Sequence, residues 1–226
     1  MAASLPYWRQ EFAIGYRAFA SPAIYRDGFW LAVQIDKEHG GSGVYGPADA
    51  HEIARDQLAE EHVHAELLRA LKPLIEAPIP AAPSLVSGAA LVALRNASWP
   101  DPALRIAVAM SEGGGLGMFQ GALAAISGRA VPLPQDAAFA GVLHRIVADE
   151  RDHVASGFAA YANANLAPTR EAAVLTRLTE ILALKVRERQ DQFAAALATA
   201  EPAPPGLAQS ETDYAAWAGT AFVTAP

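Results

Sequence analysis

Two short motifs in the chain pair a carboxylate with an imidazole at the same spacing. Glu61 precedes His64 by three positions, and Glu150 precedes His153 by three. Both motifs stand in segments rich in helix-forming residues, and on a helix such positions lie on one face about a turn apart. A carboxylate and an imidazole placed in this way can bind one metal ion together, and the carboxylate can also bridge two ions.

Each motif interrupts a stripe of apolar residues on its helix face. Leu58 and Leu68 share a face with the first motif, and Ile146 and Val154 share a face with the second. A charged group inside such a stripe is costly to bury unless it is paired or bound to a metal. Two buried pairs in one protein therefore indicate that a metal site joins them.

The neighbouring helices are expected to supply one further carboxylate each. Glu112 is the only acidic residue in the apolar segment between the two motifs that leads to the turn at 131–134. In the segment before the first motif the choice lies between Asp27, Asp36 and Glu38. A helix hairpin brings together residues at equal distances from its turn, and this favours Asp27. Glu38 lies nearer the helix end, and an irregular turn would be needed to bring it in.

Helices must position these residues, because apolar residues recur at intervals of three and four and no alternating strand pattern is evident. Ser21, Ser84, Asp101 and Thr169 are the predicted N-caps. We expect an all-α domain over 1–200, with its metal-binding core at about 22–165 and a C-terminal arm at 201–226. The layout is that of a four-helix bundle with one long crossover and additional helices. The expected helices span 6–19, 22–38, 47–72, 84–97, 102–128, 135–165 and 169–200.

The composition excludes several classes of protein. The 226 residues include no cysteine, which rules out disulfides, iron–sulfur clusters and a thiol nucleophile. The net charge is −7 and the basic residues are scattered, so a nucleic-acid partner is not expected. No stretch reaches the roughly 20 apolar residues of a membrane span, and the N-terminus lacks a secretion signal, so we expect a cytoplasmic protein. Abundant alanine and arginine suggest a GC-rich bacterial genome.

The motifs and their order resemble the ferritin-like di-iron carboxylate superfamily, over about 22–165. Members carry an acid, then Glu-x-x-His, then an acid, then Glu-x-x-His on four bundle helices. The resemblance implies a cofactor of two iron ions, with manganese as the alternative, and bridging roles for Glu61 and Glu150. It also implies that Asp149 orients His64 and that Glu60 orients His153 through hydrogen bonds. The implied metal ligands are Asp27, Glu61, His64, Glu112, Glu150 and His153.

A run of glycines after Glu112 bears on the surroundings of this site. Each glycine inside a helix costs about 1 kcal/mol relative to alanine, so a run of them needs a reason. Gly113, Gly117 and Gly121 share a face, which suggests close helix contact; a π-bulge or room for a substrate are the alternatives. The residues expected to line an apolar pocket with one amide are Leu68, Gly115, Leu116, Phe119 and Gln120.

These features predict an oxidoreductase that activates O2 to oxidise or hydroxylate a small, largely apolar organic substrate. An electron-donor protein is a candidate partner, and a homodimer is a candidate assembly. A ribonucleotide reductase subunit is disfavoured, because Leu68 stands where that resemblance would place a radical tyrosine. A ferroxidase or metal-storage protein and a metal-free helical interaction module remain the alternatives. The other histidines, His39, His51, His62 and His144, are expected at the surface or in structural roles.

Overall fold

The computed structural model describes residues 4–26, 28–40, 55–78 and 85–193, and all regular elements in these ranges are helices, as the sequence predicted. Across these ranges no helix is both long and apolar enough to span a bilayer. Two short 3-10 helices cover Pro22–Tyr25 and Lys72–Leu74. The α-helices are α1 (Leu5–Ala20), α2 (Phe29–Gly40), α3 (Arg55–Ala70), α4 (Val86–Ser98), α5 (Pro102–Met110), α6 (Gly113–Ser127), α7 (Asp136–Asn163) and α8 (Pro168–Gln192).

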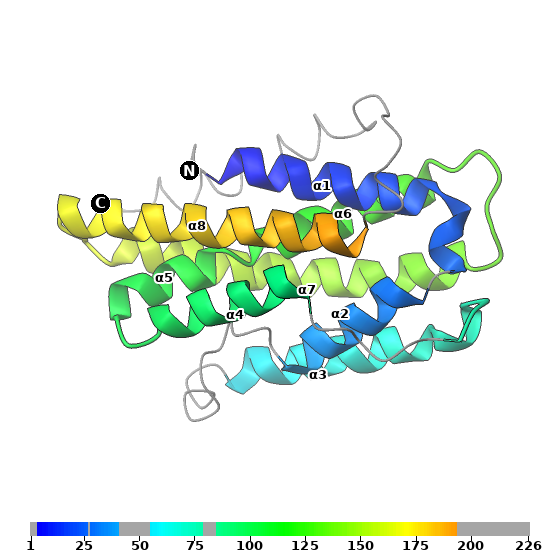
Figure 1. Ribbon diagram of the computed structural model, residues 1–226, viewed down its shortest axis with the longest axis horizontal. Coiled ribbons are helices and arrows are strands. Elements are labelled where there is room, and N and C mark those ends of the chain that lie inside the picture. Colours follow the sequence, from blue (N-terminus) through cyan, green and yellow to red (C-terminus); the bar gives the residue numbers. More distant parts are fainter. Residues whose placement is uncertain (1–3, 27, 41–54, 79–84, 194–226) are drawn as a thin grey trace.

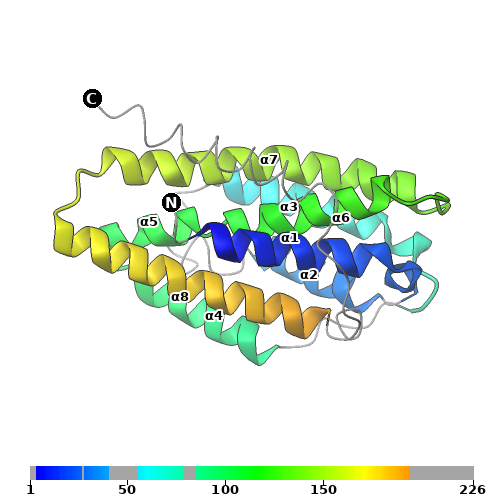
Figure 2. The same ribbon diagram turned by 90° about the horizontal axis from the view of Figure 1, so that it is seen from above.

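Four helices carry the acids and histidines of the predicted site. Helix α2 packs against α3, α3 contacts α7, and α6 runs along α7. The remaining helices surround this group: α1 lies along α6, and α4 and α5 pack against α8 (Figures 1 and 2). Helix α8 also contacts both α2 and α6, so one side of the site is formed by a helix that bears neither motif.

Large apolar side chains fill the space between these helices. Trp8 and Phe12 of α1, Trp30 of α2, and Phe139 and Phe158 of α7 are all almost fully buried. They belong to one continuous cluster that extends from α1 to α8. Burying an aromatic or branched aliphatic side chain contributes about 1.5–3 kcal/mol, so this cluster holds the helices in register around the site.

Glycines bring α1 and α6 into close contact. A Cβ atom at Gly117 would lie 2.9 Å from the indole of Trp8, and one at Gly121 would overlap the carbonyl oxygen of Phe12. Of the three explanations for the glycine run, close helix packing therefore accounts for these two positions. Gly115 differs, because a Cβ there would make only ordinary contacts, with Glu150 Oε2 at 3.8 Å and Lys185 Nζ at 3.9 Å.

The single helix predicted over 102–128 is wrong, because α5 and α6 are separated at Ser111–Glu112. Its predicted cap is confirmed: the Asp101 side chain accepts a hydrogen bond from the Ala103 amide at 3.0 Å. At the break the Ser111 hydroxyl donates to the Val108 carbonyl at 2.6 Å, and the Ser111 carbonyl accepts from Lys185 Nζ at 3.0 Å. Three glycines follow directly, and their low helix propensity makes an interruption here inexpensive.

Two other predicted helices differ at their ends. The segment predicted as one helix over 22–38 is a 3-10 helix followed by α2, although Ser21 caps its start by accepting from the Ala23 amide. The N-cap of α8 is Ala167 with Pro168 at the first helical position, so the predicted Thr169 cap is wrong. Ser84, the start of the helix predicted over 47–72 and the arm at 201–226 lie outside the described residues.

Candidate metal centre

The two motifs meet between α3 and α7. Glu61 and His64 project from α3, and Glu150 and His153 project from α7; all four side chains are buried. The rings of the two histidines lie 6.5 Å apart, measured between centroids. The apolar stripes noted in the sequence are responsible, because each helix turns the motif inward together with its core residues.

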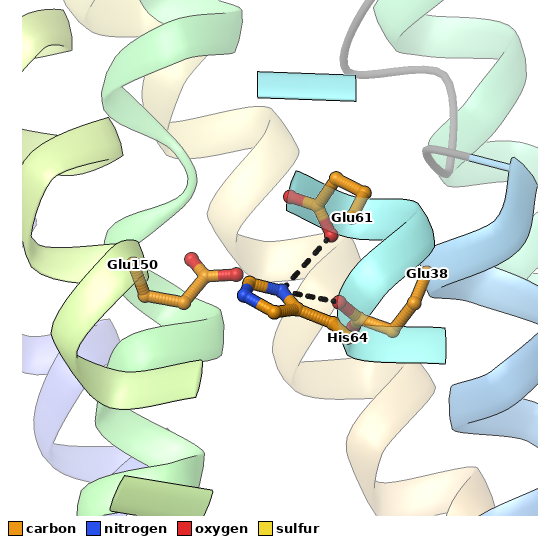
Figure 3. A group of neighbouring side chains, drawn as sticks. All are labelled: Glu38, Glu61, His64 and Glu150. Atoms are coloured by element: carbon orange, nitrogen blue, oxygen red, sulfur yellow. Dashed lines mark hydrogen bonds and ion pairs between the residues drawn. The ribbon is translucent and has the colours of Figure 1, made fainter. Parts of the chain in front are cut away.

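His64 stands at the centre of the first group of potential ligands. Its Nδ1 atom lies 3.2 Å from Glu38 Oε2 and 3.6 Å from Glu61 Oε2. Glu38, Glu61 and Glu150 approach the imidazole from α2, α3 and α7 (Figure 3). One potential ligand atom from each of these four residues lies within 4.8 Å of the others, which is close enough for one ion to reach all of them.

His153 occupies the corresponding place in a second group. Its Nδ1 atom lies 3.5 Å from Glu112 Oε2 and 3.6 Å from Glu61 Oε1. Glu112, Glu150 and His153 form a second set of potential ligands within 4.8 Å of one another. Glu150 belongs to both sets, and the two oxygens of Glu61 face the two different histidines. Glu61 and Glu150 therefore lie between the two groups of potential ligands.

The outer nitrogen of each histidine is held by an acid from the opposite motif. His64 Nε2 lies 3.1 Å from Asp149 Oδ2, and His153 Nε2 lies 2.8 Å from Glu60 Oε2. These are the two crosswise hydrogen bonds that the resemblance implied. An acid in this position fixes the tautomer and orientation of the ring, so that both Nδ1 atoms face the carboxylates.

The acid of α2 that joins the cluster is Glu38, and Asp36 is solvent-exposed. Asp27 lies outside the described residues. Glu38 is in the last turn of α2, and Glu61 is in the second turn of the described α3. Equal distance from the turn of the hairpin favours Asp27 and places Glu38 near the helix end, yet Glu38 reaches the cluster. Of the other histidines, His39, His62 and His144 are exposed as predicted, and His51 is outside the described residues.

Burial changes the proton affinity of the acids in this cluster. Loss of solvation, together with the neighbouring charge of Glu38, raises the pKa of Glu61 to about 7. Burial and the charge of Glu150 raise the pKa of Glu112 to about 8, and burial and the charge of Glu61 raise the pKa of Glu150 to about 7. Near neutral pH these carboxyl groups therefore retain protons that a metal ion would displace.

The pKa values of the two histidines are raised as well, but by their acidic neighbours and against the effect of burial. Burial opposes a charge on His64, but its contacts with Glu38 and Glu61 outweigh burial and raise its pKa to about 11. His153 is also buried, and the charges of Glu112 and Glu150 raise its pKa. The cluster thus attracts positive charge strongly, and a proton on each ring is one way of supplying it.

Each of the two groups of buried acids and histidines could hold a metal ion. Glu112 Oε2 and His153 Nδ1 are buried, face each other at 3.5 Å, and have no hydrogen-bond partner in the described part of the chain. An unsatisfied buried polar atom costs about 1–3 kcal/mol, so a ligand that bonds to these two atoms would stabilise the protein. Four carboxylates and two imidazoles are oxygen and nitrogen donors that suit iron or manganese.

A small cavity of about 50 Å³ adjoins the cluster. Gly115 and Phe119 line it as predicted, but its other walls are charged rather than apolar. Leu68 and Leu116 belong to the main hydrophobic core, and Gln120 does not line the cavity. The predicted apolar pocket with a single amide therefore does not describe this cavity. The acidic residues that line it are Glu38, Glu61, Glu112 and Glu150, and the basic ones are Lys37, Arg95, Lys185 and Arg189.

The sequence did not predict the basic residues that line the cavity, although α8 carries a signal for two of them, Lys185 and Arg189. The buried face of α8 runs through Leu178 and Leu182 and continues through Lys185, Arg189 and Gln192, all of which are also buried. Charged residues thus interrupt an apolar stripe here just as they do in the two motifs. Charged residues within the apolar stripe of α8 are therefore the sequence signal that indicates Lys185 and Arg189.

Comparison of the chain with known protein families, with curated proteins and with solved structures finds no match in any of the three.

Proposed function

We propose that this protein is a ferritin-like di-iron or di-manganese oxidoreductase that activates O2 to oxidise a small organic molecule. The observation that carries the proposal is the paired geometry of the two histidines. Both present Nδ1 to a shared set of glutamates and give Nε2 to an acid of the opposite motif. In a helical bundle that binds no metal, burying six polar side chains in this symmetric arrangement would only lower the stability of the fold.

The proposed ligands divide into two sets with two shared members. Glu38 and His64 would hold one ion and Glu112 and His153 the other, and Glu61 and Glu150 would be shared by both ions. Glu38 thus takes the place in this proposal that the resemblance implied for Asp27. When bound, the two ions would supply electrons to dioxygen, which is the chemistry that the side chains themselves cannot perform.

The protein's own residues would control access and protonation. Asp149 and Glu60 keep the imidazole rings oriented. Gly115 of α6 lines the cavity beside the cluster, and a Cβ there would still lie 3.8 Å from Glu150 Oε2, so the substrate would occupy this side of the cluster. Leu68 and Phe158, on the two helices that carry the motifs, are almost fully buried in the hydrophobic core.

Metal analysis tests this proposal directly. Protein purified without chelator should contain iron or manganese at about two ions per chain. His64→Ala and His153→Ala should each lose most of this metal, because each removes a ligand. His62→Ala on α3 and His144→Ala on α7 are matched controls with exposed histidines, and they should retain the metal.

Two results would contradict the proposal. One is wild-type protein that binds neither iron nor manganese; the other is ligand variants that keep as much metal as their controls. The ferroxidase and storage alternative predicts oxidation of added Fe²⁺ without any organic substrate, together with a large cage visible by size-exclusion chromatography. A protein that loads two ions but remains small would therefore favour the oxidoreductase.

A further inference from the structure

One acid bonded to the candidate metal centre reaches the solvent, although the centre itself is buried. The six proposed ligands are at most 10% exposed. The side chain of Glu60 on α3, by contrast, is 46% exposed, and its Oε2 atom lies 2.8 Å from His153 Nε2. Among the acids that the structure places at the cluster and at its outer hydrogen bonds, Glu60 is therefore the one open to ions in solution.

The acid that holds the other histidine offers no such opening. The side chain of Asp149 is 13% exposed, and its Oδ2 atom lies 3.1 Å from His64 Nε2 and 3.0 Å from Arg145 Nε. A cation that approached Asp149 from solution would meet the guanidinium group of Arg145 first. Glu60 forms no ion pair with a lysine or an arginine in the ranges that the structure describes. The two outer acids thus make equivalent hydrogen bonds but differ in exposure and in local charge.

His153 connects Glu60 to the interior of the centre. Its Nε2 atom faces Glu60, and its Nδ1 atom lies 3.5 Å from Glu112 Oε2 and 3.6 Å from Glu61 Oε1. Glu112 Oε2 has no hydrogen-bond partner within the described part of the chain. An ion bound at Glu60 would therefore be separated by one imidazole ring from carboxylates that can bind it.

The cavity beside the cluster is a less favourable path for a cation. Lys185 and Arg189 line it, and each is no more than 5% exposed. Repulsion between like charges becomes stronger where the effective dielectric constant is low, so a divalent ion would be repelled by these side chains. Uncharged molecules such as O2 do not experience this repulsion.

We infer that metal ions enter the centre between α3 and α7, where the carboxylate of Glu60 binds them from solution and passes them to Glu61 and Glu112. This inference rests on the proposed function, and it gives the metal a route separate from the cavity proposed for the substrate. Glu60 would then have a second role besides orienting His153. A carboxylate at an entrance attracts cations and raises their rate of association, and added salt weakens this effect.

The rate of Mn²⁺ uptake by metal-free, full-length protein tests the inference. Rapid mixing with Mn²⁺ in the presence of a fluorescent Mn²⁺ indicator measures the rate, and metal analysis measures the amount bound at saturation. Raising the ionic strength from about 0.01 M to about 0.1 M shortens the Debye length from about 30 Å to about 10 Å. Uptake by the wild-type protein should become at least threefold slower over this range.

Two substitutions of Glu60 separate its charge from its hydrogen bond. Glu60→Gln keeps an acceptor for His153 but removes the charge, so uptake should be at least fivefold slower while two ions still bind at saturation. Glu60→Asp keeps the charge but withdraws it from His153, so uptake should stay within twofold of wild type while release to a chelator becomes faster. Glu66→Gln removes the same charge from an exposed position on the same helix and should leave both rates unchanged.

An exposed pair of histidines marks the alternative entrance. His39 and His62 directly follow Glu38 and Glu61 in the sequence, and their rings lie 5.2 Å apart, measured between centroids. No printed contact joins either ring to a ligand side chain among the described residues, whereas Glu60 is bonded to His153. His39→Ala and His62→Ala should therefore take up Mn²⁺ at the wild-type rate.

The outcomes distinguish this inference from the proposed function. Protein that binds no metal refutes the proposed function. Protein that binds two ions, but loads them equally fast after Glu60→Gln, refutes the inference alone, as would slow loading in the His39 or His62 variant. Equal slowing by Glu60→Asp and Glu60→Gln would mean that only the orientation of His153 matters, and it would also overturn the inference. If Glu60→Gln does not fold, uptake by the wild-type protein that is independent of salt has the same consequence.

Discussion

The buried acids predict that the metal-free protein loses stability as the pH rises from about 5 to about 7. Glu61, Glu112 and Glu150 ionise near pH 4.5 in an unfolded chain, but in the folded protein their pKa values are about 7, 8 and 7. Between these values the folded protein binds more protons than the unfolded chain. Stability must therefore fall with rising pH over this range.

The other titrating groups leave this sign unchanged within the same range. His64, with a pKa raised to about 11, acts in the same direction above its ordinary value of 6.5. Burial and the charge of Arg189 lower the pKa of Lys37 to about 7, and burial and the charge of Arg95 lower that of Lys185 to about 8. The lysines oppose the trend chiefly above pH 7, where the unfolded chain keeps its lysine protons longer.

The expected size of the effect is a large part of the protein's stability. One pKa unit corresponds to about 1.4 kcal/mol. Integrated from pH 5 to pH 7, each of the three acids contributes a loss of about 2 kcal/mol. Together they lower the free energy of unfolding by about 6 kcal/mol, against a typical total of about 5–15 kcal/mol for a single domain.

Urea unfolding followed by circular dichroism measures this loss. The chelated protein should be much less stable at pH 7 than at pH 5, whereas protein loaded with iron or manganese should show no such fall, because metal ions displace the protons. Glu61→Gln should reduce the pH dependence of the metal-free protein by at least a third, since it removes one of three similar groups and also a charge that raises the pKa of Glu150. Glu66→Gln, at an exposed position on the same helix, should leave it unchanged. Metal-free protein whose stability is constant or rises over this range would refute the reasoning.

Two further substitutions test the packing and the outer hydrogen bonds. Gly121→Ala should destabilise the protein by about 3 kcal/mol in thermal or urea unfolding, because the new methyl group would overlap the α1 backbone, whereas Gly141→Ala should not destabilise it. Asp149→Ala should lower metal affinity about 10–100-fold in a competition titration, because His64 Nε2 loses its partner, while Asp152→Ala on the exposed face of α7 should leave the affinity unchanged.

The sequence predicted most of the site because most of its residues follow short patterns within single helices. Glu-x-x-His spacing, together with the interrupted apolar stripes, identified Glu61, His64, Glu150 and His153, and these side chains come together in the structure. Glu112 followed because it is the one acid in an apolar segment. For these residues helical periodicity alone determines which face is buried.

The parts that the sequence did not predict depend on contacts between distant segments. The acid of α2 depends on how α2 and α3 are staggered, and a periodic pattern contains no information about stagger. The break at Ser111–Glu112 is stabilised by Lys185, which lies on a different helix. The charged cavity requires residues from four helices in addition to the motifs, so no single segment reveals it.

The break between α5 and α6 also changes the electrostatic field at the cluster. A helix end carries a partial charge of about half an elementary charge, positive at the N-terminus and negative at the C-terminus. Glu112 is the N-cap of α6, and Gly115 in the first turn lies beside Glu150, so the positive end of the helix lies near two carboxylates. The C-terminal end of α5 leads to the Ser111 carbonyl, which faces the ammonium group of Lys185. One uninterrupted helix would present the same side chains without either partial charge, so the break itself helps to hold opposite charges apart on the two sides of the cavity.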